Sequence, residues 1–426
     1  MTKDSLIMSL KNIRAVGKKE LRGHLDSPTA YIVLIVFGLL VEFLFFKQAF
    51  LVGEASLRAI SVFLPWLYLL LIPAMSMGSV AEEKSHGTIE MVLTKPIRQA
   101  EFVLGKFAAS VIFVAVAMLF LFPVAWSVGR FGNLDWGSVW GLYFAAVLLG
   151  SVLMSVGLAV SAMCRSTVTA FLLSAAAHFF LLIIGFEFVT ASLPHGAALV
   201  LERLSALTHF TSMARGVLDL RDIWYAVSVV VVALSAAYLA LVKTACGNQA
   251  RIYRRHKLGT LLLVAIAILT NIVGSRIPGR IDLTADKLFT LTPTTAKVLS
   301  KLDDFVVINV YASKELPAQF QPILRDTMDM ARDYERFSSG NVRVAVKDPS
   351  SDPKIESEAQ SYGVRDVQFN VVGQEEFQVK RGYLGLAVVY AGKSQSIPLI
   401  RDTSDLEYQL TSFIYQLTNK NKKSVV

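Results

Sequence analysis

Residues 139–163 of this 426-residue chain read VWGLYFAAVLLGSVLMSVGLAVSAM, a run of 25 residues without a charged side chain. About 20 consecutive apolar residues are enough for an α-helix to cross the hydrocarbon core of a bilayer, so this run predicts a membrane-spanning helix. The composition agrees, because 54% of the residues are hydrophobic, only 18% are charged and the mean hydropathy is +0.52. These values exclude a disordered chain and are atypical of a soluble globular protein.

Six further apolar runs resemble this one, which predicts seven spans in total. In chain order the expected spans are Ala30–Phe46, Ala59–Val80, Phe107–Val128, Val139–Met163, Val168–Val189, Trp224–Val242 and Leu258–Val273. With a cytoplasmic N-terminus, 16 Lys and Arg residues fall in cytoplasmic segments and 7 in outer segments before residue 277. Because Lys and Arg favour the cytoplasmic side, we expect a multi-pass protein of the inner (plasma) membrane with its N-terminus inside and residues 277–426 outside the cytoplasm.

The first 28 residues are basic and amphipathic. Leu6, Leu10, Ile13, Gly17 and Leu21 recur at helical spacing, while most Lys and Arg residues of the segment lie elsewhere around the helix. This pattern is typical of a helix that lies on an anionic membrane surface. A merely charged lead-in to the first span is the alternative.

Residues 277–426 alternate helix-like and strand-like patterns and carry 19 basic and 19 acidic residues. Thr292-Pro293 is a helix-start signal, and Phe305–Tyr311 (FVVINVY) is rich in β-branched residues. Together the patterns predict a mixed α/β domain, with further helices over 317–337, 353–362 and 406–417 and further strands over 342–346, 367–372, 376–380, 384–390 and 394–399. The strand-like Ser424-Val425-Val426 predicts that the sheet continues and that the chain is part of a longer polypeptide.

The sequence lacks common motifs of catalytic and metal sites. It contains no G-x-x-x-x-G-K-[ST] phosphate loop, H-E-x-x-H, C-x-x-C or G-x-S-x-G, and its six His and two Cys have no metal-ligand spacing. We therefore predict no catalytic, cofactor-binding or metal-binding residue. The net charge of +9 arises between apolar spans, so no nucleic-acid partner is expected. Glu42 and Glu187 lie in expected spans, where carboxylates are functional candidates, but both are close enough to the interface to be solvated.

The stretch between the second and third expected spans is Ala81–Phe107, AEEKSHGTIEMVLTKPIRQAEFVLGKF. Glu82, Glu83 and Lys84 open it, Gly87-Thr88 interrupts it, and Pro96 follows a short amphipathic turn. Such a loop either presents a short helix to a soluble partner or is simply solvated, and the residue pattern alone leaves both interpretations open.

This stretch resembles the signature of ABC-2-type permeases, which is an acidic pair, Gly-Thr, a Leu-Thr-x-Pro-like turn and a Gly-Lys pair opening the third span. The resemblance implies that the loop is the coupling helix that docks on an ATP-binding subunit and that the N-terminal helix is the family's elbow helix. The residues expected to couple to the ATPase are Glu82, Glu83, Lys84, Gly87, Thr88, Glu90, Leu93 and Pro96; Thr94, Gly105 and Lys106 also fit the pattern.

Two further stretches carry resemblances. Residues 209–222, from His209-Phe210 to Arg221-Asp222, are similar to the outer re-entrant segment of gliding-motility and copper-processing permeases (GldF-like and NosY-like). Residues 281–293, with Ile281-Asp282-Leu283-Thr284 and KLFTLTP, and the following FVVINVYAS are similar to the start of a GldG-like auxiliary subunit. That resemblance implies an anchor helix followed by an extracytoplasmic α/β domain.

The expected fold is a membrane α-helical bundle of the ABC-2 (type V exporter-like) kind, with six spans plus a seventh anchor helix, followed by a mixed α/β extracytoplasmic domain. Its expected parts are an amphipathic elbow helix (1–28), a six-span permease domain (29–243), a cytoplasmic linker with the anchor helix (244–276) and a GldG-like domain (277–426).

The resemblance implies a homodimer in the lipid bilayer with two separate ABC ATPase subunits, which bind ATP and magnesium. Hydrolysis there would drive export or mechanical work on an envelope protein or substrate, and this chain would have no enzyme activity. The alternatives are a scaffold that recruits envelope proteins and a membrane-anchored enzyme.

Overall fold

In the computed structural model the chain forms two compact units, residues 1–285 (unit 1) and residues 286–426 (unit 2). The structure describes residues 3–52, 56–186, 189, 200–201, 204–246, 250–274, 280–285, 287, 291–300, 302, 304–314, 316, 320–338, 340–372, 377–403 and 405–418. The division falls after Ala285 rather than after Arg276. Residues 280–285, which the sequence pattern assigns to the tail, therefore belong with the membrane unit.

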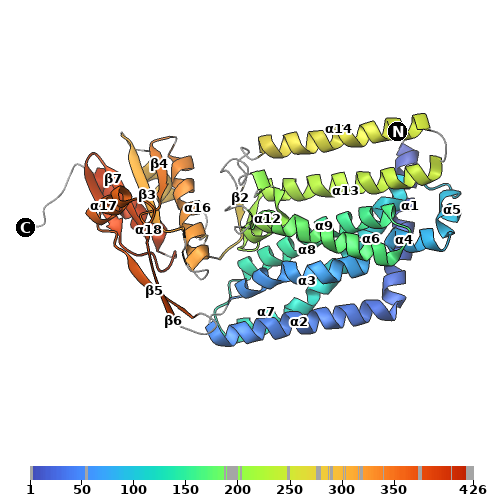
Figure 1. Cartoon of the computed structure of the whole chain (residues 1–426), viewed down its shortest axis with the longest axis horizontal. Helices are drawn as coiled ribbons and strands as arrows, with labels where there is room; N and C mark the ends of the chain where they lie inside the picture. The colour runs from blue at the N-terminus through green and yellow to red at the C-terminus, as the bar shows by residue number, and fades with distance from the viewer. Residues whose placement is uncertain are drawn as a thin grey trace, which may run out of the picture. The chain divides into compact units, whose positions relative to one another are not determined.

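Unit 1 is a helical bundle in which most of the long helices run side by side (Figure 1). A short antiparallel pair of strands, β1 (Val217–Asp219) and β2 (Arg280–Asp282), completes it. The helices are α1 (Lys3–Asp26), α2 (Pro28–Val52), α3 (Arg58–Ser76), α4 (Gly78–Ser85), α5 (Thr88–Leu93), α6 (Gln99–Met118), α7 (Phe122–Phe131), α8 (Trp136–Met163), α9 (Thr167–Ile183), α12 (Ala206–Met213), α13 (Leu220–Cys246) and α14 (Ala250–Gly274).

Five helical stretches in the described part of the chain are long and apolar enough to cross a membrane. They are Pro28–Gln48, Arg58–Ser85, Gln99–Phe131, Trp136–Met163 and Leu220–Ala245, which match the first four and the sixth expected spans. The fifth expected span coincides with the shorter apolar helix Thr167–Ile183, and the seventh lies within α14. The chain is thus a multi-pass membrane protein, and the total of seven spans stays a prediction. Glu42 is half-buried in α2, whereas Glu187 lies outside the described residues.

The helix α8 is the most buried of these spans, with 72% of its apolar window buried inside the bundle. Small residues allow this close packing. An added Cβ at Gly150 would lie 2.5 Å from Val114 Cγ1 of α6, and one at Gly157 would lie 2.2 Å from Ser76 Oγ of α3. The neighbours of α8 therefore approach its backbone directly, which makes it the central element of the unit.

Unit 2 contains a four-stranded mixed sheet with the strand order β4-β3-β7-β8, and β5 and β6 form a separate antiparallel pair. β3 is parallel to β4 and antiparallel to β7, and β7 is antiparallel to β8. This confirms the predicted mixed α/β arrangement. The elements are α15 (Pro293–Leu299), β3 (Val306–Ala312), α16 (Gln321–Phe337), β4 (Val342–Lys347), α17 (Pro353–Ser361), β5 (Val367–Val372), β6 (Phe377–Gly382), β7 (Leu384–Tyr390), β8 (Lys393–Ile397) and α18 (Leu406–Thr418).

Helices cover both faces of this sheet because side chains alternate along each strand. Val306, Ile308 and Val310 of β3 belong to a core shared with residues of α16 and α18. Tyr311 points to the other face, where it packs in a cluster with residues of α17 and its hydroxyl donates to Glu358 Oε1 at 2.8 Å. The strand-like residues 424–426 lie outside the described part of the chain.

Candidate functional site

The predicted coupling residues lie at one end of the unit 1 bundle, where α4 and α5 are found (Figure 1). α4 follows α3 with only Met77 between them, and Met77 itself has helical dihedral angles. Ser161 of α8 secures this junction. Its hydroxyl accepts hydrogen bonds from the N–H groups of Val80 (3.1 Å) and Ala81 (3.0 Å) and donates to the Met77 carbonyl (2.9 Å). The loop therefore starts from a helix end that α8 holds in place.

Gly87 separates α4 from α5. Its φ of +69° lies in the left-handed region, which costs most other residues about 1–2 kcal/mol. An added Cβ would meet no heavy atom within 4 Å, so glycine is required for the backbone conformation rather than for a close approach. Thr88 begins α5 and its hydroxyl donates to the Glu83 carbonyl at 3.2 Å. Leu93 ends α5, and its side chain is not among those the structure describes.

The loop has an outward and an inward side. Glu82, Glu90 and Pro96 are exposed, and so is Met91. Ile89 is 4% exposed and packs with apolar residues of α4, α6, α8 and α13, namely Val80, Phe102, Val103, Leu158, Ala159, Ala162, Ala233, Ala237 and Leu241. Ile89 thus anchors α5 to the bundle, while Glu90 and Met91 present an acidic and an apolar group outward.

Two of the predicted coupling residues turn inward instead. Glu83 Oε1 lies 3.3 Å from Lys106 Nζ, and the same nitrogen lies 2.7 Å from Glu20 Oε2. Lys106 is 2% exposed, and a buried charge is tolerated when it is paired in this way. Lys84 Nζ donates to the carbonyl oxygen of Ala162 in α8. Glu83 and Lys84 therefore hold the loop to the bundle, and Glu82, Glu90 and Met91 face away from it.

The helix α1 packs closely along α6. An added Cβ at Gly105 would lie 2.7 Å from Val16 Cβ, and one at Gly17 would lie 3.1 Å from the Gly105 carbonyl oxygen. At the adjacent turn, Asn12 Nδ2 donates to Glu101 Oε2 at 2.9 Å. The predicted N-terminal helix therefore exists and uses the face that includes Gly17 to bind α6. Its placement on a membrane surface stays a prediction.

His24 lies in the last turn of α1, with its ring centroid 5.4 Å from that of Phe113. Burial lowers the pKa of His24 from its usual value, Lys106 acts in the same direction and Glu20 opposes it. The imidazole is therefore neutral at pH 7 and does not add a cation to the charged cluster of Glu20, Glu83 and Lys106.

The opposite end of the bundle carries a second constellation, which fastens residues 280–285 to α8 (Figure 1). Asp135 caps α8 by accepting hydrogen bonds from the N–H groups of Gly137 (2.8 Å) and Ser138 (3.3 Å), and it also accepts one from the N–H of Ala285 (3.1 Å). Burial alone would raise the pKa of Asp135, but the hydrogen bonds from Ser138, Ala285 and Gly137 hold it below its usual value. An added Cβ at Gly137 would lie 1.7 Å from the Leu283 carbonyl oxygen. We call residues 280–285 the strap.

The strap also pairs with the stretch that was predicted as a re-entrant segment. That stretch folds as the end of α12, a turn at Gly216, β1 and the first residues of α13, and β1 pairs with β2 of the strap. The N–H of Leu283 donates to the Gly216 carbonyl at 2.9 Å. His209 Nδ1 lies 2.7 Å from Asp222 Oδ1, and the His209 ring stacks on Tyr225 with centroids 3.9 Å apart. α8, α12, α13 and the strap are therefore joined at one place.

Sequence reasoning missed Glu20 and Ser161 because their partners are remote in the chain. It also missed Asp135, although an Asp directly before an apolar run is a helix-capping signal. For Glu20 the available signal was Lys106, a cation at the start of an otherwise apolar span, since charged residues are conspicuous in membrane segments. No cluster of three or more His, Cys, Asp or Glu suited to a metal ion occurs in the part of the chain that the structure describes.

Comparisons with known proteins agree with the division into two units. A model of the ABC-2 family transporter protein matches residues 4–258, and a domain of unknown function (DUF7088) matches residues 285–389. An uncharacterised protein of Borreliella burgdorferi is 26% identical over 150 residues, which is 34% of this chain. That match covers 28% of the Borreliella protein's own length. Because the transporter model covers more than half of the residues, the chain belongs to the ABC-2 family of transporter proteins.

Proposed function

We propose that residues 81–96 dock this chain on a separate ATPase subunit, and that the outward side of the loop makes the contact. The family normally works with an ATPase subunit in the membrane. The observation that carries the proposal is the two-sided loop. Ile89 is buried at 4% exposure while Met91 is exposed at 69%, and Glu82 and Glu90 are exposed beside it. Exposed carboxylates near an apolar anchor suit a partner surface with basic groups around an apolar pocket.

The charged cluster of Glu20, Glu83 and Lys106 would carry the movement onward. It joins α1, α4 and α6 through ion pairs that meet at one buried lysine. Charge-assisted hydrogen bonds are directional and stronger than neutral ones. A displacement of the coupling loop would therefore pull on the elbow helix α1 and on the third span together. Glu83, Lys84, Gly87 and Thr88 act within the loop by keeping its shape.

ATP hydrolysis by the partner would then drive mechanical work on unit 2. The attachment of the strap favours mechanical work over simple export. The strap is fixed to the start of α8 and to β1, and the chain enters unit 2 directly after it. A relative movement of α8 and α13 would be passed to the residues that follow Ala285. Such a two-state mechanism requires that ATP and the partner bind the two states with different affinity.

The proposed assembly is a homodimer of this chain with two ATPase copies, in the inner membrane, with the N-terminus in the cytoplasm and unit 2 on the envelope side. ATP and magnesium would be held by the ATPase subunits. The topology is testable by single cysteines at Ser351 and Ser394, both exposed, in a background without Cys164 and Cys246. Both should react with an impermeant maleimide in intact cells, and protection of both until lysis contradicts the orientation.

Docking is tested by reversing the outward charges in the double variant Glu82→Lys/Glu90→Lys. We expect the cognate ATPase to be lost from pull-downs of the solubilised chain, because like charges now face each other across the interface. The matched control is Asp366→Lys/Asp405→Lys, which reverses two exposed carboxylates of unit 2 and should leave recovery unchanged. Undiminished ATPase recovery with the loop variant, at an unchanged melting temperature, would show that the docking surface lies elsewhere.

A further inference from the structure

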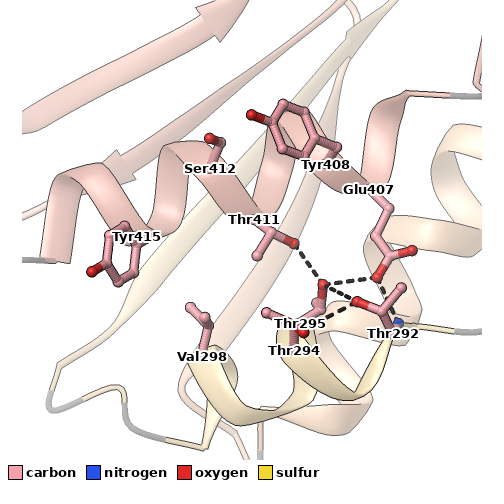
Figure 2. Close-up of a pocket in the computed structure, with 9 residues that line it drawn as sticks. All are labelled: Thr292, Thr294, Thr295, Val298, Glu407, Tyr408, Thr411, Ser412 and Tyr415. Atoms are coloured by element: carbon pink, nitrogen blue, oxygen red, sulfur yellow. Dashed lines mark hydrogen bonds between the residues drawn. The ribbon is translucent and has the colours of Figure 1, made fainter.

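Unit 2 has a cavity of about 430 Å³ between α15 and α18 (Figure 2) that plays no part in the proposed ATPase coupling. Its volume lies within the range of small-ligand sites. The matched domain of unknown function ends at residue 389, so it contains α15 but not α18. The cavity is thus formed by one helix inside that domain and one beyond it.

The floor of the cavity is a closed hydrogen-bond network. Glu407 Oε1 accepts hydrogen bonds from the Thr292 N–H (2.6 Å) and the Thr295 hydroxyl (2.7 Å). The Thr295 hydroxyl lies 2.8 Å from that of Thr411, which in turn lies 2.6 Å from the Tyr334 hydroxyl. Because these groups are held by one another, the floor is rigid before any ligand arrives, and preorganisation of this kind favours binding.

The rim is different, since its polar groups are free and its aromatic rings are exposed. Tyr408 and Tyr415 of α18 are 77% and 54% exposed and stand at separate positions along the helix, with Ser412 between them (Figure 2). Within the described residues, the hydroxyls of Tyr408, Ser412, Tyr415 and Thr294 have no hydrogen-bond partner. The rim therefore offers two ring faces and four hydroxyl groups to a ligand.

The lining also indicates which ligands do not fit. Among the described residues that line the cavity, Glu407 is the one that is charged and none is Lys or Arg, so phosphate groups and other anions would meet no cation there. An extended peptide usually binds by adding to an unpaired strand, but both walls here are helices. What remains is an uncharged ligand with apolar C–H faces and many hydroxyl groups.

We propose that this cavity is a binding site for a neutral oligosaccharide. Tyr408 and Tyr415 are seven residues apart on one helix, which places their attachment points about 10 Å apart along its axis. Two sugar rings of one short chain, separated by a third unit, match that spacing. Each pyranose ring would stack a C–H face on a tyrosine ring, and its hydroxyls would bond to Thr294 and Ser412. The proposal is independent of the ATPase coupling.

The test is a binding titration of the full chain in detergent with soluble tetrasaccharides, followed by saturation-transfer NMR. The probes are β-1,4-linked tetramers of N-acetylglucosamine and of glucose, with each monosaccharide as the short-chain comparison. We expect at least one tetramer to bind saturably and its monosaccharide to bind more weakly. Tyr408→Ala and Tyr415→Ala should each weaken tetramer binding about tenfold, which corresponds to about 1.4 kcal/mol.

Conservative and control variants separate stacking from unfolding. Tyr408→Phe and Tyr415→Phe keep the rings and should keep most of the affinity, while Phe337→Ala, which removes an exposed ring of α16, should leave it unchanged. The proposal is overturned if neither tetramer binds saturably at millimolar concentration, or if binding persists in both Tyr→Ala variants. It is equally overturned if an extended peptide, rather than a sugar, binds in a manner that depends on both tyrosines.

Discussion

Replacing Lys106 should reveal how strongly the loop of residues 81–96 is tied to the bundle. The side chain of Lys106 is 3% exposed, and its Nζ lies 2.7 Å from Glu20 Oε2 and 3.3 Å from Glu83 Oε1. Lys106→Met keeps the length of the side chain and removes its charge. Two carboxylates that are 15% and 17% exposed would then keep as a cation partner only the exposed Lys19, whose Nζ lies 3.9 Å from Glu83 Oε1.

The expected loss follows from these distances. At an effective dielectric constant of about 20, the two contacts correspond to Coulomb energies of about 6 and about 5 kcal/mol. Desolvation of the three groups offsets much of this, and breaking a buried ion pair by removing one partner typically costs about 3–5 kcal/mol. At about 2 °C per kcal/mol for a protein of this size, the melting temperature of Lys106→Met should fall by about 6–10 °C.

The assay is the thermal unfolding of the solubilised chain, followed by intrinsic fluorescence. Lys95→Met is the matched control, because Lys95 is an exposed lysine of the same loop and its replacement should change stability by less than about 0.5 kcal/mol. The triple variant Lys106→Met/Glu20→Gln/Glu83→Gln should recover most of the loss, since no charge is left unpaired. A melting temperature of Lys106→Met close to that of the unmodified chain would refute the reasoning, and so would a triple variant as unstable as the single one.

Three further predictions concern glycine conformation, the strap and pH. Gly87→Ala should destabilise the chain by about 1 kcal/mol, because the φ of Gly87 is +69°. Gly259→Ala should stabilise it by up to about 1 kcal/mol, because Gly259 lies in the helix α14 and an added Cβ would meet no atom within 4 Å. Equal melting temperatures of the two variants would contradict this difference. Gly137→Ala should push the strap (residues 280–285) away from α8, because the added Cβ would collide with it. Trypsin should therefore cut the strap faster in Gly137→Ala than in Gly259→Ala, as measured by mass spectrometry. Equal cleavage rates in the two variants would disprove the attachment. Burial lowers the pKa of His24, so its contribution to stability is present above the unfolded pKa of about 6.5 and is lost as the pH falls below it. The melting temperature should therefore drop between pH 7.5 and 5.5 in the unmodified chain and drop less in His24→Phe; identical pH profiles would exclude His24 as the cause.

Local sequence patterns predicted the elements of both units well. The apolar runs located the first four and the sixth spans, and strand-like FVVINVY became β3 in a mixed sheet. Gly87 was singled out as a break, and it does interrupt the helix with a left-handed conformation. These features are readable because they depend on residues a few positions apart, through helical or strand periodicity and backbone sterics. The attachment of residues 280–285 to unit 1 is not readable in the same way, because these residues look like the start of a tail domain until their pairing with β1 is known.

By itself the sequence determined that the chain is a multi-pass membrane protein of the ABC-2 kind with an α/β tail, since apolar length and local motifs suffice for that. Only the tertiary structure decided that Glu83 and Lys84 face the bundle, that Lys106 meets Glu20, and that the strap is fastened to Asp135. It also brought α15 and α18 together around the cavity of unit 2. These contacts join residues separated by many positions, and they depend on how helices pack, which small side chains and close backbone approach control. Local periodicity specifies which face of a helix is buried, but not which distant helix buries it.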